Sequence, residues 1–245
     1  TNTFLNGYAR AAQPADFCNL RYLICGAEKV QQATREHWAR EFGVRVFEGY
    51  GATETSPVLS TNTIFESRVG SVGRLFPGVD YKLEKIEGVE TGGRLFVRGP
   101  NIMKGYLNKD ANAAFKKHKG WYDTGDIVTV DDDRYITIQG RAKRFAKISG
   151  EMVSLTAVED ALAGAFPHHG EDCQVAVIAR PDADKGEILI AATNKEDLKL
   201  DEIRKAIQAK GLPNLAAPRD LKHLEELPVL GTGKINHREL ETLLA

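Results

Sequence analysis

Four short segments hold the residue types of this chain that could do chemistry. They are Glu48–Thr55, Trp121–Asp126, Gly140–Gly150 and Leu227–Lys234. Each combines glycines, which let backbone approach a flat or charged ligand closely, with hydroxyl, carboxylate or cationic side chains. Together they offer a slot for a base, anchors for a ribose, a metal ligand and cations for phosphate charge. These groups suffice to hold a nucleotide and to activate a carboxylate on it.

Glu48–Thr55 offers several of these groups within eight residues. Tyr50 can stack on a base, Thr53 can donate a hydrogen bond to a phosphate, and Glu54 is a hard oxygen ligand suited to magnesium. A glycine-rich turn with a capping threonine and an exposed glutamate explains the octapeptide equally well. This segment alone therefore leaves both interpretations open.

The other three segments each supply one polar group that is ambiguous by itself. Asp126 follows a glycine and could bind a ribose diol, or it could cap its own turn. Arg141 could reach ribose or phosphate oxygens with its fork of donors, or lie in an ordinary basic surface turn. Lys234 ends a glycine loop that is not a Walker A loop, since Ile235 follows the lysine. Taken singly, Lys234 is a solvated charge.

Length and composition limit the class of protein. The chain has 245 residues, 42 % of them hydrophobic, which suits one large or two ordinary domains. The formal charge of −1 gives no indication of nucleic-acid binding.

The three widely spaced cysteines argue against a disulfide framework and a zinc ribbon, and they favour a protein of the reducing cytoplasm. No apolar run approaches the ~20 residues that span a bilayer. The chain opens on Thr1, without a signal peptide, so we expect a piece of something longer.

The first part of the chain is patterned as a β-α-β unit followed by antiparallel strands. Residues 20–26 and 44–47 are predicted strands, and residues 28–42 between them are a predicted amphipathic helix. Such a unit implies a parallel pair, whose ligands lie at the carboxyl ends of the strands. From residue 56 to 140, glycine and proline separate short strands, which predicts an antiparallel sheet or a distorted barrel.

The last hundred residues or so are predicted to form a compact α+β domain. Helices are expected at residues 155–166 and 200–210 and after Gly233, with strands near 173–179 and 187–193. We therefore expect residues 1–142 to form the C-terminal part of a large AMP-binding domain, and residues 143–245 to form a small mobile domain.

In order and spacing, the four segments resemble the motifs of the adenylate-forming superfamily of acyl-CoA synthetases, luciferases and adenylation domains. Those enzymes join a carboxylic acid to AMP and pass the acyl group to a thiol. The resemblance implies that Lys234 reaches the carboxylate and α-phosphate, that Lys143 is the hinge of the small domain, and that Ser149-Gly150 is the loop for thiol transfer. It implies catalytic roles for Thr53 and Glu54, with Glu54 also as the Mg²⁺ ligand. The implied nucleotide site comprises Gly26, Ala27, Glu28, Glu48, Gly49, Tyr50, Gly51, Thr53, Asp126 and Arg141.

Residues 140–154 narrow the resemblance to bacterial acyl-acyl carrier protein synthetases, often fused to a 2-acylglycerophosphoethanolamine acyltransferase domain. That branch implies ATP and Mg²⁺, a fatty acid, and the 4′-phosphopantetheine thiol of acyl carrier protein, with CoA as the alternative acceptor. It also implies a place in the cytoplasm or at the inner face of the plasma membrane. The tail Ile235–Arg238 resembles the wider superfamily instead. The basic cluster Arg141, Lys143, Arg144 and Lys147 would suit an acidic carrier protein or a CoA phosphate.

Two sequence features favour other interpretations. The superfamily's phosphate loop and the first half of its large domain are not found, so the chain is expected to cover the last third to half of a synthetase, inactive alone in adenylation. A protein of another class, a module that only binds nucleotide or carrier protein, is the alternative interpretation.

His168, His169 and Cys173 could form a metal site, but the side chains of adjacent histidines are expected to diverge, which favours a polar loop. Trp38, Trp121 and the apolar stripe of 155–166 are expected in the core.

Overall fold

The computed structural model describes residues 1–170, 172–231 and 233–244, in two compact units. The first unit comprises residues 1–85 and 91–138, and the second comprises residues 86–90 and 139–245. The chain therefore passes from one unit to the other between Ile138 and Gln139. The expected domain boundary and hinge at Lys143 stay predictions.

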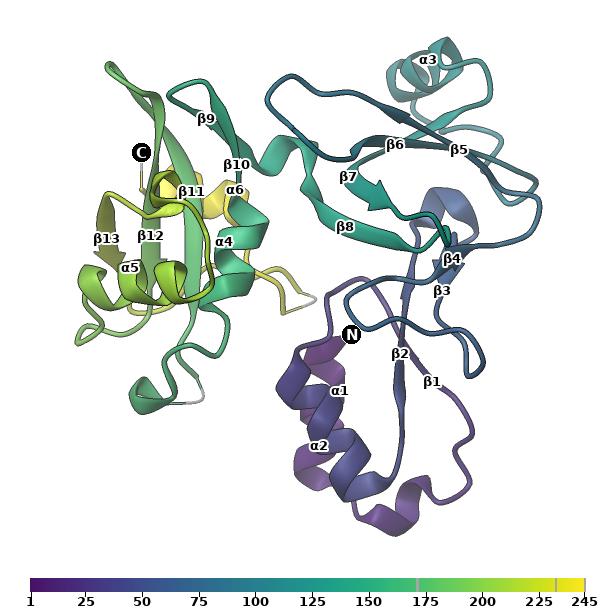
Figure 1. The fold of residues 1–245 in the computed structure, drawn as a ribbon, viewed down its shortest axis with the longest axis horizontal. Coiled ribbons are helices and arrows are strands. Elements are labelled where there is room, and N and C mark those ends of the chain that lie inside the picture. The colour runs from purple at the N-terminus through teal and green to yellow at the C-terminus, as the bar shows by residue number, and fades with distance from the viewer. Residues whose placement is uncertain (171, 232, 245) are drawn as a thin grey trace. The chain divides into compact units, whose positions relative to one another are not determined.

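The first unit opens with a helical layer on a parallel strand pair. Helices α1 (Asn2–Ala11) and α2 (Gln32–Phe42) lie beside strands β1 (Leu23–Cys25) and β2 (Val46–Tyr50) (Figure 1). The strands pair in parallel, which confirms the predicted β-α-β unit. Trp38 is fully buried between the helices and strands, as expected for a core residue.

Antiparallel strands that extend this sheet, and a second sheet, complete the first unit. β3 (Ser60–Thr61) pairs antiparallel with β2 and β4 (Arg74–Leu75) with β3, while the other sheet has the order β5-β6-β7-β8. Backbone hydrogen bonds between Ile136 and both Val72 (2.8 Å) and Gly73 (3.0 Å) join the two sheets. Both are open, so the expected antiparallel region takes the form of two joined open sheets and not of a closed barrel. The remaining elements of this unit are β5 (Asp80–Glu84), β6 (Gly93–Arg98), α3 (Lys109–Lys117) and β7 (Tyr122–Val130), and β8 (Ile136–Arg141) begins in this unit and ends in the second.

The second unit is a sheet covered by helices on both faces. The strand order is β10-β9-β12-β11, and β13 pairs in parallel with β12. One face packs against α4 and α5 in the larger apolar cluster of the unit, and the other packs against α6 through Leu240. The elements are β9 (Phe145–Ile148), β10 (Glu151–Ser154), α4 (Leu155–Leu162), β11 (Val175–Asp182), β12 (Gly186–Thr193), α5 (Leu200–Ala209), β13 (Asp220–His223) and α6 (His237–Leu243).

Side-chain caps explain where several helices begin. Ser154 accepts a hydrogen bond from the Ala157 amide (3.1 Å) at the start of α4, and Asn108 accepts one from Ala111 (3.0 Å) at the start of α3. At α5, the Glu202 carboxylate accepts the Lys199 amide at 3.0 Å, as in a capping box. None of the helices in the described part of the chain has the length and apolar character of a membrane span.

Candidate active site

The carboxyl ends of β1 and β2 bring two of the predicted nucleotide-binding segments together. Cys25 pairs with Glu48, so Gly26–Glu28 continues beside Gly49 and Tyr50. Glu48, Gly49 and Tyr50 lie inside β2, which extends three residues beyond the strand expected from the sequence. The extra length places the motif on a paired strand and not in a loose turn.

Glu48 is buried and its carboxylate serves the fold. Oε1 accepts the Val30 amide at 2.8 Å, and Oε2 accepts the Arg35 guanidinium at 3.0 Å. Only 4 % of Glu48 is exposed, so this ion pair is shielded from water. The contacts fix the segment before α2 against β2 and thereby hold the end of the strand that carries Tyr50.

A tight 3₁₀ turn, Thr53–Thr55, follows β2. The Thr55 hydroxyl accepts the Ala52 amide at 2.9 Å and donates to a backbone carbonyl, which closes the turn. A Cβ on Gly51 would lie 1.9 Å from the Pro57 carbonyl oxygen, so only glycine fits there. The turn leaves Thr53 exposed and Glu54 half-buried.

Tyr50 and Asp126 meet across the first unit. The Tyr50 phenol donates to Oδ2 of Asp126 at 2.5 Å, although 76 residues separate them. This contact brings together two residues of the predicted nucleotide site, whose role in binding stays a prediction. Asp126 is 5 % exposed, so its carboxylate is withdrawn from bulk water beside the aromatic ring.

Asp126 reaches this position through a bulge in β7. The glycine before Asp126 is expected to form a turn, but the structure has it inside the strand. Arg94 pairs with Ile127 but Phe96 pairs with Asp123. The residues of β7 between these two pairs therefore outnumber those of β6 and form a bulge. Gly125 has a φ of +71°, which explains the glycine. The Thr124 hydroxyl donates to the Leu95 carbonyl (2.9 Å) and accepts the Asp126 amide (3.1 Å), so the bulge is held from both sides.

Tyr106 is a site residue that the sequence did not indicate. Its phenol donates to Oε1 of Glu54 at 2.9 Å and thereby orients the carboxylate expected to bind magnesium. Burial, followed by the hydrogen bond to Glu54, raises the pKa of Tyr106 above its ordinary value. A tyrosine in the Gly105-Tyr106 loop gives no local sequence signal of a partner 52 residues earlier.

The predicted site residues of the second unit lie on turns and a strand end. Arg141 ends β8, and Lys143 is exposed in the short helical turn Ala142–Arg144. Ser149 and Gly150 form the turn between β9 and β10 with φ values of +51° and +89°, as in a primed hairpin turn. A surface hollow of about 450 Å³ adjoins this turn and is lined by Lys147, Ser149, Gly150, Asp184, Lys185, Gly186 and Glu187.

One member of the predicted basic cluster faces inward. Arg144 pairs with Glu159 at 2.7 Å and donates to the Val177 carbonyl at 3.0 Å, with only 14 % of its side chain exposed. Burial raises the pKa of Glu159, and the guanidinium opposes that shift. Arg144 therefore holds the sheet to α4, and a docking surface on this unit would have to use other cations.

Lys234 stands at the end of a small hairpin. Val229 and Ile235 form an isolated bridge, and the Leu230 amide donates to the Lys234 carbonyl at 2.7 Å. Gly233 has a φ of +82° and turns the chain. Thr232 of the predicted motif lies outside the described residues.

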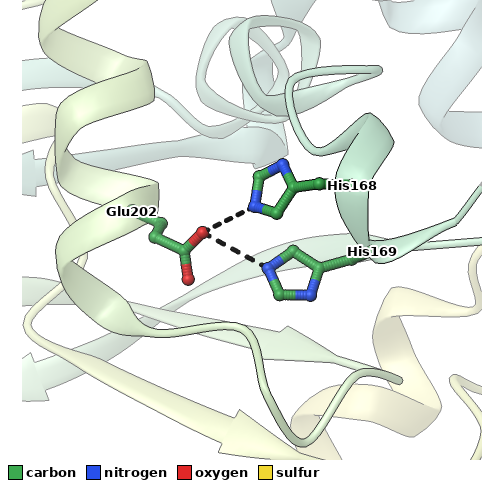
Figure 2. Close-up of side chains that lie close together, drawn as sticks. All are labelled: His168, His169 and Glu202. Atoms are coloured by element: carbon green, nitrogen blue, oxygen red, sulfur yellow. Dashed lines mark hydrogen bonds and ion pairs between the residues drawn. The ribbon is translucent and has the colours of Figure 1, made fainter.

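His168 and His169 converge, which corrects the expectation that adjacent histidines diverge. Both Nε2 atoms face Oε2 of Glu202, at 2.8 Å and 3.3 Å (Figure 2). The 3₁₀ turn Pro167–His169 rotates the two rings to the same side, with centroids 4.3 Å apart. Cys173 is not a member of this group.

Comparisons with known proteins show which enzymes this chain is similar to. Residues 1–107 match the model of a family described as AMP-binding enzyme. A long-chain-fatty-acid–CoA ligase of Yersinia pestis is 33 % identical over 231 residues, which cover 92 % of this chain and 40 % of the ligase. The crystal structure of an anthranilate CoA ligase in complex with anthranoyl-AMP is 27 % identical, with a TM-score of 0.73 over 98 % of this chain and 48 % of that one.

A further solved structure supports the fold alone. The o-succinylbenzoate CoA synthetase of Bacillus subtilis, in complex with its acyl-adenylate intermediate, has a TM-score of 0.82 at 24 % identity, over 98 % of this chain and 49 % of that one. The chain thus spans about half or less of the length of the proteins described here, from 40 % of the Yersinia pestis ligase to 49 % of the Bacillus subtilis synthetase. Its first 107 residues match the AMP-binding enzyme family, and the relatives described above that match nearly the whole chain are named as CoA ligases.

Proposed function

We propose that this chain is part of a ligase that joins a carboxylic acid to the α-phosphate of ATP and then passes the acyl group to a thiol. The observation that carries the proposal is the contact between Tyr50 and Asp126, which combines an aromatic face with a buried carboxylate. An adenosine needs such a pair, because its base stacks and its ribose diol donates two hydrogen bonds. A long-chain fatty acid is the proposed substrate, after the named activity of the Yersinia pestis relative.

The first unit would bind the nucleoside and its phosphates. In this proposal the Tyr50 ring stacks on adenine, Gly26–Glu28 and Gly49 flank the base, and Asp126 accepts the ribose hydroxyls. Tyr50 and Asp126 would exchange their mutual hydrogen bond for contacts with the nucleotide. Thr53, exposed on its turn, would donate to a phosphate oxygen.

Glu54 suits a hard divalent cation. It is a half-buried carboxylate whose Oε1 is already oriented by the Tyr106 phenol, and carboxylate oxygens are preferred ligands of Mg²⁺. When bound there, Mg²⁺ would neutralise phosphate charge. Glu54 is thus both the proposed metal ligand and, with Thr53, part of the proposed catalytic group.

The second unit would supply the mobile cations. Arg141 is proposed to reach ribose or phosphate oxygens, and Lys234 to stabilise the carboxylate and α-phosphate charge that meet during adenylation. Rotation about Lys143 would then remove Lys234 and bring Ser149-Gly150 to the adenylate for thiol transfer.

The acceptor thiol is the finer part of the proposal. CoA is favoured because the relatives described above are named as CoA ligases. The phosphopantetheine of acyl carrier protein is the second candidate, supported by the resemblance of residues 140–154. Supplying the full-length enzyme with each acceptor at equal concentration, and measuring thioester formation, separates the two. Either acceptor would meet Lys147 and Lys185 at the hollow beside Ser149-Gly150.

The nucleotide site can be tested on this chain by titrating AMP and 2′,3′-dideoxy-AMP and following NMR shifts. We expect AMP to bind more tightly than the dideoxy compound, because only AMP offers the diol to Asp126. Asp126→Ala should weaken AMP binding and remove the preference. Tyr50→Phe, which keeps the ring and loses only the hydroxyl, is the matched control and should retain the preference.

Two outcomes would contradict the nucleotide site. One is equal binding of both nucleotides to the unmodified chain, and the other is an unchanged preference in Asp126→Ala. A module that binds AMP without catalysis is the remaining alternative. It would be supported if the full-length protein bound AMP but formed no adenylate.

A further inference from the structure

A second polar cluster lies in the other unit. His168 and His169 come from the turn before β11, and Glu202 comes from the first turn of α5 (Figure 2). One nitrogen of each histidine and one oxygen of the glutamate lie within 4.8 Å of one another. We propose that these three side chains form a binding site for a divalent transition-metal ion of the zinc class. This site is independent of the proposed ligase reaction.

The separations of the ligand atoms suit a tetrahedral ion. Zinc bonds of about 2.0–2.1 Å imply ligand atoms roughly 3.3 Å apart. Nε2 of His169 and Oε2 of Glu202 are already 3.3 Å apart, while Nε2 of His168 is 2.8 Å from the same oxygen. A shift of about half an ångström in the exposed His168 side chain would bring its Nε2 to the same distance from Oε2, and water would complete the coordination of the ion.

Asp197 orients the His169 ring for binding a metal ion. Its carboxylate lies 2.8 Å from Nδ1 of His169, which is 6 % exposed. With Nδ1–H donating to Asp197, a neutral imidazole directs the lone pair of Nε2 at the Glu202 oxygen. Two lone pairs that face each other need a positive charge between them, which is either a proton on Nε2 or a metal ion that displaces this proton. A carboxylate behind a histidine is also the arrangement that commonly orients histidine ligands of metals.

The ligand types select the kind of ion. Two imidazoles with one carboxylate suit Zn²⁺, Cu²⁺ or Ni²⁺, whereas Mg²⁺ and Ca²⁺ favour oxygen ligands alone. The ion would connect the Pro167–His169 turn to the start of α5. Glu202 can bind it without loss of the helix cap, because its other oxygen accepts the Lys199 amide at 3.0 Å.

The test is calorimetric titration of ZnCl₂ into the chain after chelator treatment and desalting, at pH 7.5. All proteins carry Cys18→Ser, since Cys18 is an exposed thiol that could bind zinc by itself. We expect saturable binding at one ion per chain and a rise in melting temperature that EDTA reverses. His169→Ala should abolish both effects, and Glu202→Gln should weaken them. Asp197→Asn should lower the affinity by about 10- to 100-fold, as for other residues that support metal ligands.

His118→Ala is the matched control, because His118 is an exposed histidine of the other unit. It should bind zinc like the parent. Cobalt substitution gives a second measurement, since tetrahedral Co²⁺ with nitrogen ligands absorbs visible light and the His169→Ala variant should lose the band. The proposal is overturned if the parent shows no saturable binding, or if His169→Ala and the parent bind zinc equally well. Circular dichroism of each variant verifies that it is folded.

Discussion

The buried ion pair of Glu48 and Arg35 fixes the end of β2 on which the candidate nucleotide site stands. Both side chains are shielded, with 5 % and 15 % of their surfaces exposed. Charges in such surroundings are costly unless they are paired and hydrogen-bonded, and Glu48 also accepts the Val30 amide. Tyr50 lies two residues beyond Glu48, so the pair acts on the site through position and not through contact with a ligand.

Removal of one partner of this pair should be strongly destabilising. Arg35→Met leaves the Glu48 carboxylate buried without its cation, and we expect a loss of about 3–5 kcal/mol in the free energy of unfolding. Adding Glu48→Gln to Arg35→Met should recover part of the loss, because the neutral amide oxygen can still accept the Val30 amide. Urea unfolding of the three proteins measures this. A double variant that is less stable than Arg35→Met would refute the explanation.

Two glycines should respond oppositely to alanine. At Gly51 the new Cβ would meet the Pro57 carbonyl oxygen at 1.9 Å, so the turn must deform, and we expect a loss of several kcal/mol, on the scale of severe steric mutants. At Gly7, in the exposed part of α1, no atom lies within 4 Å, and alanine should stabilise by up to about 1 kcal/mol through helix propensity. Thermal unfolding of both variants tests the prediction, which fails if they shift in the same direction.

At the scale of elements, a half-buried titratable group at the start of α6 faces α4. His237, the first residue of α6, lies 3.7 Å from Glu159 of α4, too far for a hydrogen bond. Burial, followed by the nearby charge of Arg144, lowers the pKa of His237 from 6.5 to about 4, while Glu241 opposes the shift. The imidazole therefore stays neutral in the folded chain at pH values where it is protonated in the unfolded chain.

This difference predicts how stability depends on pH. Between pH 6.5 and 4 the unfolded state binds a proton that the folded state does not, so stability falls as pH falls through this window. The shift corresponds to a contribution on the order of 3 kcal/mol at most. We expect His237→Gln to lose less stability than the parent between pH 7 and pH 4. Parallel urea unfolding curves at the two pH values measure the difference, and identical losses would contradict it.

Predictability from sequence differed between elements for physical reasons. The β-α-β unit and the helices α4 and α5 were predicted because their apolar residues recur at regular spacing. At β7 the sequence indicates a turn where the structure has a bulge, because glycine with a positive φ occurs in both. Helices α1 and α3 and the hairpin of β9 and β10 were not predicted. Contacts such as Tyr106 with Glu54 depend on loop paths that local sequence does not encode.

At the scale of the whole molecule, the proposed roles divide between the two units. Base, ribose and metal contacts are assigned to the first unit, and the adenylation lysine and thiol loop to the second. An enzyme with this division can use its second unit twice, once for adenylation and once for thiol transfer, if the connection between the units is a hinge. Alternation of this kind makes the two half-reactions separable by mutation.

Lys234→Ala in the full-length enzyme should separate them. We expect pyrophosphate exchange to be lost, because the lysine stabilises charge only during adenylation, and transfer from supplied acyl-adenylate to be largely intact. Lys185→Ala, at the hollow beside Ser149-Gly150, is the opposite control and should affect transfer more than exchange. Equal loss of both half-reactions in Lys234→Ala would indicate a structural lysine.

The 245-residue chain itself should not catalyse adenylation. The Thr/Ser/Gly-rich phosphate loop is not found in its sequence, so the β- and γ-phosphates would lack a cradle of backbone amides. AMP carries neither phosphate, and its binding should persist. Incubation with ATP, magnesium and a fatty acid, with mass spectrometry for acyl-adenylate, measures this. Robust product formation would show that other residues serve the phosphates.

β1 lies at one end of its sheet and, within the part of the chain that the structure describes, pairs only with β2. Ile24 on this strand is 60 % exposed, and Tyr22 just before it is 58 % exposed. A strand edge with large apolar side chains is a template for pairing with a second chain, so concentrated samples should precipitate through β1. Ile24→Lys would place a charge on that edge and should raise the concentration at which the protein stays in solution. The handling of this chain in the laboratory thus depends on the exposed edge at Tyr22 and Ile24 as well as on its proposed chemistry.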